Sequence, residues 1–528
     1  MNKRKTMLVS LLTAASLTCG CAGVPDRTTG APLHETAEVT EEVELFEEIY
    51  TKRYPVDQTE VSYKLNAEGG LFEGSVRSDG DYYDGQGYII LDEGMTLTHV
   101  VEPEYAQHYR IVIAVQSYDG AVIKLGASRE TVGYYYVPAS NTPDFQLMAV
   151  DCVYLTNAST VLTFTCEKGS ASLDYIIAEN TDEAAPECYR TGTAAVSPNS
   201  TIAAIGTMKY LCEGYGKRVI TAQNVTPGTN AELEAIHAET GRYPAMRCGE
   251  LAPITDREDG ERSDTDLDLA LEWGKNGGLV SYTWHWYSPD TAKTVYSAET
   301  GFSLRSAMRD MNIDEIALAD SDQLKALREN GLLTADLMDL IGDMDAAARA
   351  LKAFADADIP VIWQPLPDPD GGLYWWCGDP DSYKALWELM FRRFTEYHGL
   401  GNLIWVWNGS SPDYRPSDKQ FDILGQTTNE GSSASFAGRF IALAGMSDVT
   451  VKPMAITSCD RLPKPEYLLR DNALWLWTAI GSGDVIINSD GTLSERLTDW
   501  QTLNDAYNSE LCITLDELPD MAEYAVSE

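Results

Sequence analysis

Residues 360–409 read PVIWQPLPDPDGGLYWWCGDPDSYKALWELMFRRFTEYHGLGNLIWVWNG, and this stretch decides the fold. An apolar run from Pro360 to Leu366 has the character of a buried strand and leads into a loop rich in Asp, Pro and Gly. A helical pattern follows from Asp381 to Tyr397, and a second apolar run covers Leu403 to Trp407. Strand, helix and strand in this order are typical of a parallel sheet.

The same alternation extends on both sides of this stretch, from about residue 200 onward. Eight strands are predicted, at Arg218–Gln223, Pro244–Cys248, Leu279–His285, Pro360–Leu366, Leu403–Trp407, Phe421–Gly425, Lys452–Ser458 and Ala473–Thr478. Helical patterns between them include Asp264–Lys275, Leu337–Ala357, Asp381–Tyr397 and Ser435–Ala444. Eight such units predict an α/β fold, a (β/α)8 TIM barrel over residues 195–520.

Residues 59–182 have a different pattern, with short β-type runs separated by Gly, Asp and Ser. The runs are Tyr88–Leu91, Tyr109–Val115, Val122–Leu125, Val161–Thr165 and Leu173–Ile177. Closely spaced short strands of this kind predict an antiparallel β-sandwich that precedes the barrel.

The first 58 residues are predicted to be a leader and a tether. A charged start, an apolar run and small residues before Cys21 indicate a lipoprotein signal peptide over residues 1–20, with Cys21 as the lipidated residue. Residues 21–58 are rich in Thr, Pro and Glu and indicate an acidic flexible tether. We therefore expect a lipid anchor at the extracellular face of a bacterial membrane, with plain secretion as the alternative.

The bulk composition narrows the class of partner. With 81 acidic against 39 basic residues the formal net charge is -42, which opposes nucleic acid as a partner. The cysteines after Cys21 lack CxxC spacing, so we expect no zinc ribbon and mostly buried thiols, with a Cys152–Cys166 disulfide left open.

In a TIM barrel the chemistry lies where the strands end, and here those positions are rich in aromatic residues. They include Trp284, His285 and Trp286 after the third strand, Trp375 and Trp376 after the fourth, Trp407 at the end of the fifth, and Trp475 and Trp477 in the eighth. Aromatic residues gathered at one barrel mouth favour a sugar-binding cleft. For Trp363 and Trp405, inside their strands, core packing is the better interpretation.

Residues 361–380 and 386–409 closely resemble the region from the fourth to the fifth strand of glycoside hydrolase family 26, the β-mannanase family. Further matches are GKRVITAQN, TGRYPA, GGLVSYTWHWYSP, FDILG, KPMAIT and WQTLNDAYNSELCITLDELP. The resemblance spans about 195–520 and implies the TIM barrel and an O-glycosyl hydrolase that acts on β-mannan. Such retaining enzymes use two carboxyl groups roughly 5 to 5.5 Å apart.

The catalytic positions of that family are altered in this chain. The resemblance places Asp368 at the acid/base, Gln364 and Pro367 at its Arg and His neighbours, and Ser458 at the nucleophile. Asn429 stands where the family has a Tyr that orients the nucleophile. A serine without an evident base cannot form the glycosyl-enzyme as a carboxylate does, so hydrolysis by the family's route should fail.

The resemblance also implies a sugar-contacting framework that is largely retained. Its members here are His285, Trp375, Trp376, Trp407 and Trp477, whereas Leu373 replaces a usual aromatic residue. We expect no cofactor for the barrel.

The N-terminal sandwich resembles carbohydrate-binding module family 35. The matches are Asn66–Gly69, Asp84–Tyr88 and Leu173–Ile176. The resemblance implies a structural Ca²⁺ held by Glu68 and Asp174, since calcium prefers oxygen ligands. The module has no Trp, and Tyr82, Tyr83 and the tyrosines from 134 to 136 are its candidate sugar contacts.

Three functional hypotheses follow. The first is a tethered pseudoenzyme that binds β-mannan or a related β-glycan without cutting it. The second is an active endo-β-mannanase with relocated carboxylates, Asp460 together with Asp368 or Asp370, whose wider separation would favour inversion. The third is a structural surface protein whose cleft has no ligand.

Overall fold

The computed structural model describes residues 59–526, apart from 81, 129, 182–183, 185, 193, 256–259, 291–293 and 447–450. The leader, the tether and Cys21 lie outside the described residues. The described chain contains two β-sheets, an antiparallel one up to Asn180 and a parallel one from Val219 onward.

The parallel sheet closes on itself as the sequence predicts. Its strands are β11 (Val219–Asn224), β12 (Met246–Glu250), β13 (Leu279–Trp284), β14 (Val361–Pro365), β15 (Leu403–Asn408), β16 (Ile423–Thr428), β17 (Met454–Cys459) and β18 (Trp477–Ile480). Each pairs with the next in parallel, and β18 pairs with β11. The result is an eight-stranded TIM barrel, and β19 (Cys512–Ile513) extends it beside β11.

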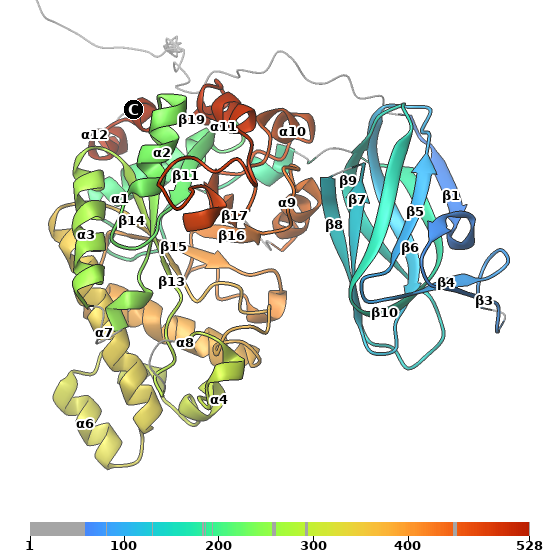
Figure 1. Cartoon of the computed structure of the whole chain (residues 1–528). Helices are drawn as coiled ribbons and strands as arrows, with labels where there is room; N and C mark the ends of the chain where they lie inside the picture. The colour runs from blue at the N-terminus through green and yellow to red at the C-terminus, as the bar shows by residue number, and fades with distance from the viewer. Residues whose placement is uncertain are drawn as a thin grey trace, which may run out of the picture. The chain divides into compact units, whose positions relative to one another are not determined.

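Helices follow the strands and surround the barrel (Figure 1). They are α1 (Ile202–Gly214), α2 (Ala231–Thr240), α3 (Gly260–Lys275), α4 (Leu304–Ala307), α5 (Ile313–Ile316), α6 (Ser321–Glu329), α7 (Ala335–Asp356), α8 (Pro380–Arg392), α9 (Ala437–Ala444), α10 (Pro465–Arg470), α11 (Trp500–Tyr507) and α12 (Met521–Val526). Thr334 caps α7 by accepting the N–H of Leu337, as a threonine at this position should. The predicted helix from Asp381 to Tyr397 forms α8 and then a π-helical turn, Arg393–Tyr397.

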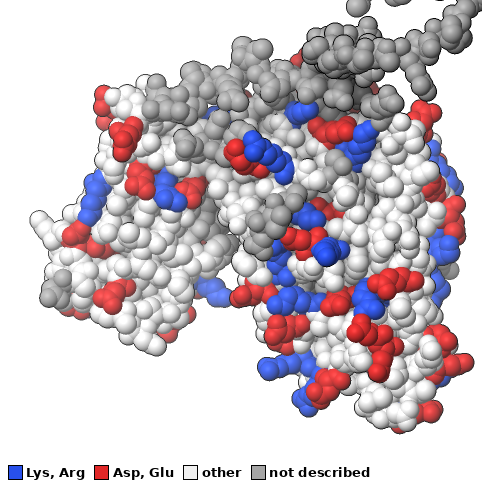
Figure 2. Space-filling model, turned by 180° about the vertical axis from the view of Figure 1, so that it is seen from behind, with Lys and Arg blue, Asp and Glu red and all other residues white. Residues whose placement is uncertain are grey.

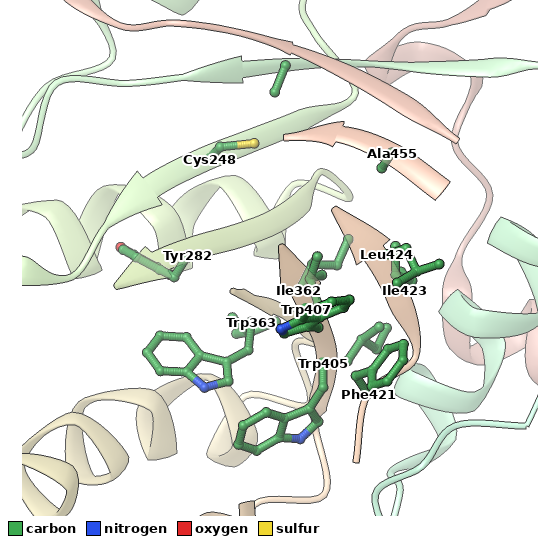
Figure 3. Packing of buried hydrophobic residues seen from close by; sticks show 14 of the residues in the cluster. Cys248, Tyr282, Ile362, Trp363, Trp405, Trp407, Phe421, Ile423, Leu424 and Ala455 are labelled. Atoms are coloured by element: carbon green, nitrogen blue, oxygen red, sulfur yellow. The ribbon is translucent and has the colours of Figure 1, made fainter. Parts of the chain in front are cut away.

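Barrel strands such as β15 are buried along their whole length, because one face packs in the barrel and the other against helices. Figure 3 shows Trp363 and Trp405 on the side of the strands remote from Cys248 and Ala455. Trp405 packs there on Phe391 of α8, with ring centroids 5.0 Å apart. The interpretation of these two tryptophans as core residues is confirmed.

The sandwich contains ten antiparallel strands. They are β1 (Ser62–Asn66), β2 (Leu71–Phe72), β3 (Ser75–Arg77), β4 (Tyr88–Asp92), β5 (Thr96–Val101), β6 (Gln107–Gln116), β7 (Ala121–Ala127), β8 (Glu130–Val137), β9 (Gln146–Leu155) and β10 (Thr160–Asn180). The two strands predicted at 161–165 and 173–177 are one strand, β10, which pairs with members of both halves of the fold. Gly169, with φ 78°, lies within β10 where the chain leaves one set of partners for the other.

All eight described cysteines are free thiols, and seven are buried. Cys152 and Cys166 are not joined, because β9 pairs with β6 and not with the strand that carries Cys166. No helix within the described ranges is long and apolar enough to cross a membrane. On the face shown in Figure 2, basic side chains lie among acidic ones.

Candidate active site at the mouth of the barrel

Asp368 lies just beyond β14 and is held in a tight turn. Leu366 and Asp368 both adopt positive φ, 52° and 49°, a conformation that is unusual for a leucine. The N–H of Asp368 donates to the carbonyl of Asn408 at 2.9 Å, and the Thr427 hydroxyl donates to its Oδ2 at 3.4 Å. The ends of β14, β15 and β16 therefore fix this carboxyl group together.

The environment of Asp368 makes it a weak acid. Burial raises its pKa to about 6, and the charge of Asp370 acts in the same direction, while the charge of His285 opposes the shift. A carboxyl group with a pKa in this range can carry a proton near neutral pH, as a general acid must.

His285 is oriented by Glu250, the last residue of β12. Its Nδ1 lies 2.6 Å from Oε2 of Glu250, and its backbone N–H donates to Oε1 at 3.0 Å. Burial lowers the pKa of His285, but the charge and hydrogen bond of Glu250 outweigh that effect and raise the pKa above its usual value. With Nδ1 engaged, Nε2 is the ring nitrogen left for a ligand, and Asp368 is close enough to influence the ring electrostatically.

Ser458 occupies the end of β17, where the family resemblance places the nucleophile. It pairs with Thr427 across the parallel ladder and is half-buried. The hydroxyl of Thr427 donates to Asp368, so Ser458 lies on the strand next to β16, which contributes this contact to the acid. No carboxylate stands at this position of β17.

Asp460, the alternative carboxylate, is engaged by the loop that follows β16. Its Oδ2 accepts the N–H of Gly431 at 2.8 Å, and its Oδ1 is buried without a hydrogen-bond partner. Its charge acts on Glu430, whose pKa burial raises to about 7. Asp460 thus shares its surroundings with Glu430.

Arg439 interacts both with Glu430, the neighbour of Asp460, and with Asp368. Its guanidinium forms an ion pair with Glu430, and its Nη1 donates to the carbonyl of Thr427 at 3.0 Å. The charge of Arg439 also lowers the pKa of Asp368. The guanidinium of Arg439 therefore interacts with the carboxyl groups of both Glu430 and Asp368, and it is bonded to β16, the strand next to the one that carries Ser458. Glu250, Glu430 and Arg439 were not predicted from the sequence; the position of Glu250 at the end of a predicted strand was the one signal available.

The four predicted tryptophan contacts are deeply buried. The exposed fractions of Trp375, Trp376, Trp407 and Trp477 are 3, 0, 0 and 2%. The indole N–H of Trp376 donates to the carbonyl of Pro367 at 2.9 Å, which supports the turn before Asp368. Trp477 is the first residue of β18 and pairs with Ile220 near the start of β11, so it lies toward the opposite end of the strands from Asp368. Contact of the four rings with sugar stays a prediction. The side chain of His285, in contrast, is 34% exposed.

In the sandwich, the two predicted calcium ligands face one loop. Both oxygens of Asp174 lie 3.0 Å from the N–H of Asp84, and Oε1 of Glu68 accepts the N–H of Gln86 at 2.8 Å. Oε2 of Glu68 is buried without a partner, which suits a cation. Three acidic, histidine or cysteine side chains arranged to hold a metal are not found among the described residues. Calcium held by Glu68 and Asp174 would therefore draw its other ligands from backbone and water, and it would offset the repulsion between the two carboxylates.

Comparisons with known proteins agree with the fold. The family model described as glycosyl hydrolase family 26 matches residues 196–486. A mannan endo-1,4-beta-mannosidase of Thermothelomyces thermophilus is 27% identical over 86% of this chain and 89% of its own length. A mannan endo-1,4-beta-mannosidase B of Piromyces is 24% identical over 86% of this chain and 76% of its own.

Solved structures give the same result. The structure of a GH26-CBM35 beta-(1,4)-mannanase from Podospora anserina is 26% identical, with a TM-score of 0.55, and the match covers 87% of this chain and 99% of that one. A ruminal GH26 endo-beta-1,4-mannanase has a TM-score of 0.59 at 20% identity, covering 88% and 99%, and it supports the fold alone.

Proposed function

The chain belongs to glycosyl hydrolase family 26, and from this membership we propose that it binds β-1,4-linked mannan at the barrel mouth without cleaving it by the family's double displacement. The observation that carries the proposal is Ser458 at the end of β17, paired with Thr427, whose hydroxyl donates to Asp368. A retaining enzyme needs a carboxylate there to attack the anomeric carbon.

The experiment that tests this proposal compares release with binding on one preparation. The purified chain is incubated with soluble β-mannan, reducing ends are measured, and a binding isotherm is recorded with a β-1,4-linked mannan oligosaccharide of six units. Binding without release supports the proposal. Release at the level of an ordinary mannanase refutes it, and a flat isotherm supports a structural surface protein instead.

One observation favours a second candidate, an active endo-β-mannanase with relocated carboxylates. Asp368 has a pKa of about 6 and suits a general acid. Asp460 would then activate water, although its Oδ2 already accepts the N–H of Gly431. Loss of all release on Asp368→Asn and on Asp460→Asn, with inverted product at the new anomeric centre, would establish this alternative.

The proposal includes attachment to the outer face of a bacterial membrane through Cys21, which lies outside the described residues. Mass spectrometry of the mature N-terminus tests it: a thioether-linked diacylglycerol on Cys21 supports the anchor, and an unmodified N-terminus refutes it.

Calcium in the sandwich is likewise proposed. Every tryptophan lies at or after Trp273, so tryptophan fluorescence reports on the barrel and cannot detect calcium binding in the sandwich. Hydrogen exchange of the amides of Asp84 and Gln86 follows the sandwich, and it should accelerate when EDTA replaces CaCl₂. Equal exchange rates in both buffers would contradict the proposal.

A further inference from the structure

Two loops at the barrel mouth are joined by a short antiparallel ribbon. Tyr296, in the loop after β13, and Tyr374, in the loop after β14, are bridge partners. The N–H of Ser297 donates to the carbonyl of Leu373 at 2.9 Å, and the N–H of Trp375 donates back to the first loop at 3.0 Å. The Ser297 hydroxyl adds a bond to the same Leu373 carbonyl, at 3.1 Å. The two tyrosines are therefore held in fixed register.

Their rings continue a stack that begins in the core. Tyr374 lies 4.5 Å from the buried Trp376, with 19° between the ring planes. Tyr296 lies 6.2 Å from Tyr374, with 18° between the planes. Exposure increases along this stack, from 0% at Trp376 through the half-buried Tyr374 to 43% at Tyr296. The last ring is thus rigidly supported and open to solvent.

The stack starts beside the candidate catalytic acid. The ring of Tyr374 is 5.5 Å from that of His285. Burial raises the pKa of Tyr374 well above its usual value, and the charges of Asp368 and Glu250 raise it further, so all three groups are neighbours. A ligand that reaches from Asp368 outward along Tyr374 therefore meets Tyr296 next.

The chemistry of the exposed ring selects a neutral ligand with an apolar face. Single exposed aromatic residues are common on protein surfaces and need no explanation. Tyr296 differs because two stacked rings and a backbone ribbon fix its orientation, so a ligand that packs on it costs little side-chain entropy. A pyranose ring presents such a face through its C–H groups, and its hydroxyls can bond to the phenol.

We propose that Tyr296, supported by Tyr374 and Trp376, is a sugar-stacking subsite that binds a pyranose unit of a β-linked glycan on the side of Tyr374 remote from His285 and Asp368. This inference rests on the proposed function, because it names a place where the same glycan is held. Nothing in the stack requires that the bond at Asp368 be cleaved.

The test measures binding of the β-1,4-linked mannan hexasaccharide by the full chain and its variants. Tyr296→Ala should weaken binding about tenfold, the usual worth of a well-placed aromatic contact. Tyr296→Phe keeps the ring and should remain within about twofold of the original chain. Tyr397→Ala is the control, because Tyr397 is a similarly exposed tyrosine, 38%, that lies just before β15 and so at the opposite end of the strands.

A second measurement needs no substitution. In hydroxyl-radical footprinting, the oligosaccharide should slow oxidation of Tyr296 and leave Tyr397 unchanged. If the original chain binds and Tyr296→Ala binds equally well, or if Tyr296 is not protected, the subsite is refuted while the proposed function stands. If the original chain does not bind the oligosaccharide at all, the proposed function fails and the subsite fails with it.

Discussion

Replacing Asp368 by Asn should make the barrel more stable at neutral pH and have little effect in acid. The pKa of an aspartate is 3.8 in the unfolded chain and about 6 in the folded protein. Because the folded pKa is raised, the folded state holds the proton more tightly, and stability is lost as the pH rises from about 4 through 6. The difference of 6 − 3.8 = 2.2 pKa units corresponds to about 3 kcal/mol, lost in full above pH 7.

Asparagine removes this cost and preserves the local geometry. Its amide oxygen can still accept the Thr427 hydroxyl, and asparagine tolerates the positive φ of 49° at this position. The assay is urea unfolding followed by tryptophan fluorescence at pH 4 and pH 8. Asp368→Asn should gain up to about 3 kcal/mol over the original chain at pH 8 and less than about 0.5 kcal/mol at pH 4.

The matched control is Asp370→Asn, because Asp370 is an exposed acid two residues away whose bond to the N–H of Ser410 an amide can preserve. This control should change stability by no more than about 0.5 kcal/mol at either pH. An Asp368→Asn variant whose advantage is the same at pH 4 and pH 8 would refute the reasoning, because the gain would then come from something other than the buried charge.

Three further predictions concern the same barrel. Glu430→Gln should also stabilise it increasingly as the pH rises from about 4.5 to about 7, with a constant gain at higher pH, because the raised pKa of about 7 means that ionisation of Glu430 costs folding free energy; unfolding curves that keep a constant offset from about pH 4.5 to about pH 7 would contradict the prediction. The double change Ser458→Glu with Asp368→Glu should release reducing sugar from β-mannan at least roughly tenfold faster than either single change, because Asp368→Glu alone has no nucleophile and Ser458→Glu alone keeps an acid that is one methylene too short; no release by the double variant would count against a recently lost activity. Trp405→Ala should cost about 3–5 kcal/mol of unfolding free energy and leave the mannan affinity of the folded protein unchanged, since its ring packs on α8; a loss of affinity in the folded variant would show that Trp405 acts on the site.

The sequence predicts the barrel well because its strands are short and apolar, and every pair of consecutive strands except β15 and β16 is separated by an α-helix. The predicted ends are less accurate. The eighth strand was predicted at 473–478, whereas β18 spans Trp477–Ile480. Residues 473–476 are apolar and buried, but they precede the strand. Pairing with β11 begins only at Trp477. Hydrophobicity reports burial, and it cannot separate a strand from a buried segment leading to it.

Only part of the candidate site could be predicted, because some of its residues belong to local motifs and others are brought together by the fold. Asp368 and Ser458 were identified because each stands in a local motif. Glu250 and Arg439 belong to separate segments, and their roles depend on the hydrogen bonds to His285 and Thr427 that only the closed barrel forms. The burial of Trp407 was also not apparent, because a position at a strand end does not show whether a ring points to solvent or into a layer of other side chains. Trp477 lies at the start of β18 and not near its end, because the predicted strand began four residues too early.

The pairing of β18 with β11 has a consequence for how the protein is made. Ile220 of β11 pairs with Trp477 of β18, so the barrel cannot close until β18 has been synthesised. At synthesis rates of about 5–20 residues per second this delay is on the order of ten to fifty seconds. During that time the growing chain presents the unpaired edge of β11, a surface that invites association with other nascent chains. A ribosome that stalls before β18 therefore leaves an aggregation-prone open sheet, and slow translation through this region should increase the demand for chaperones.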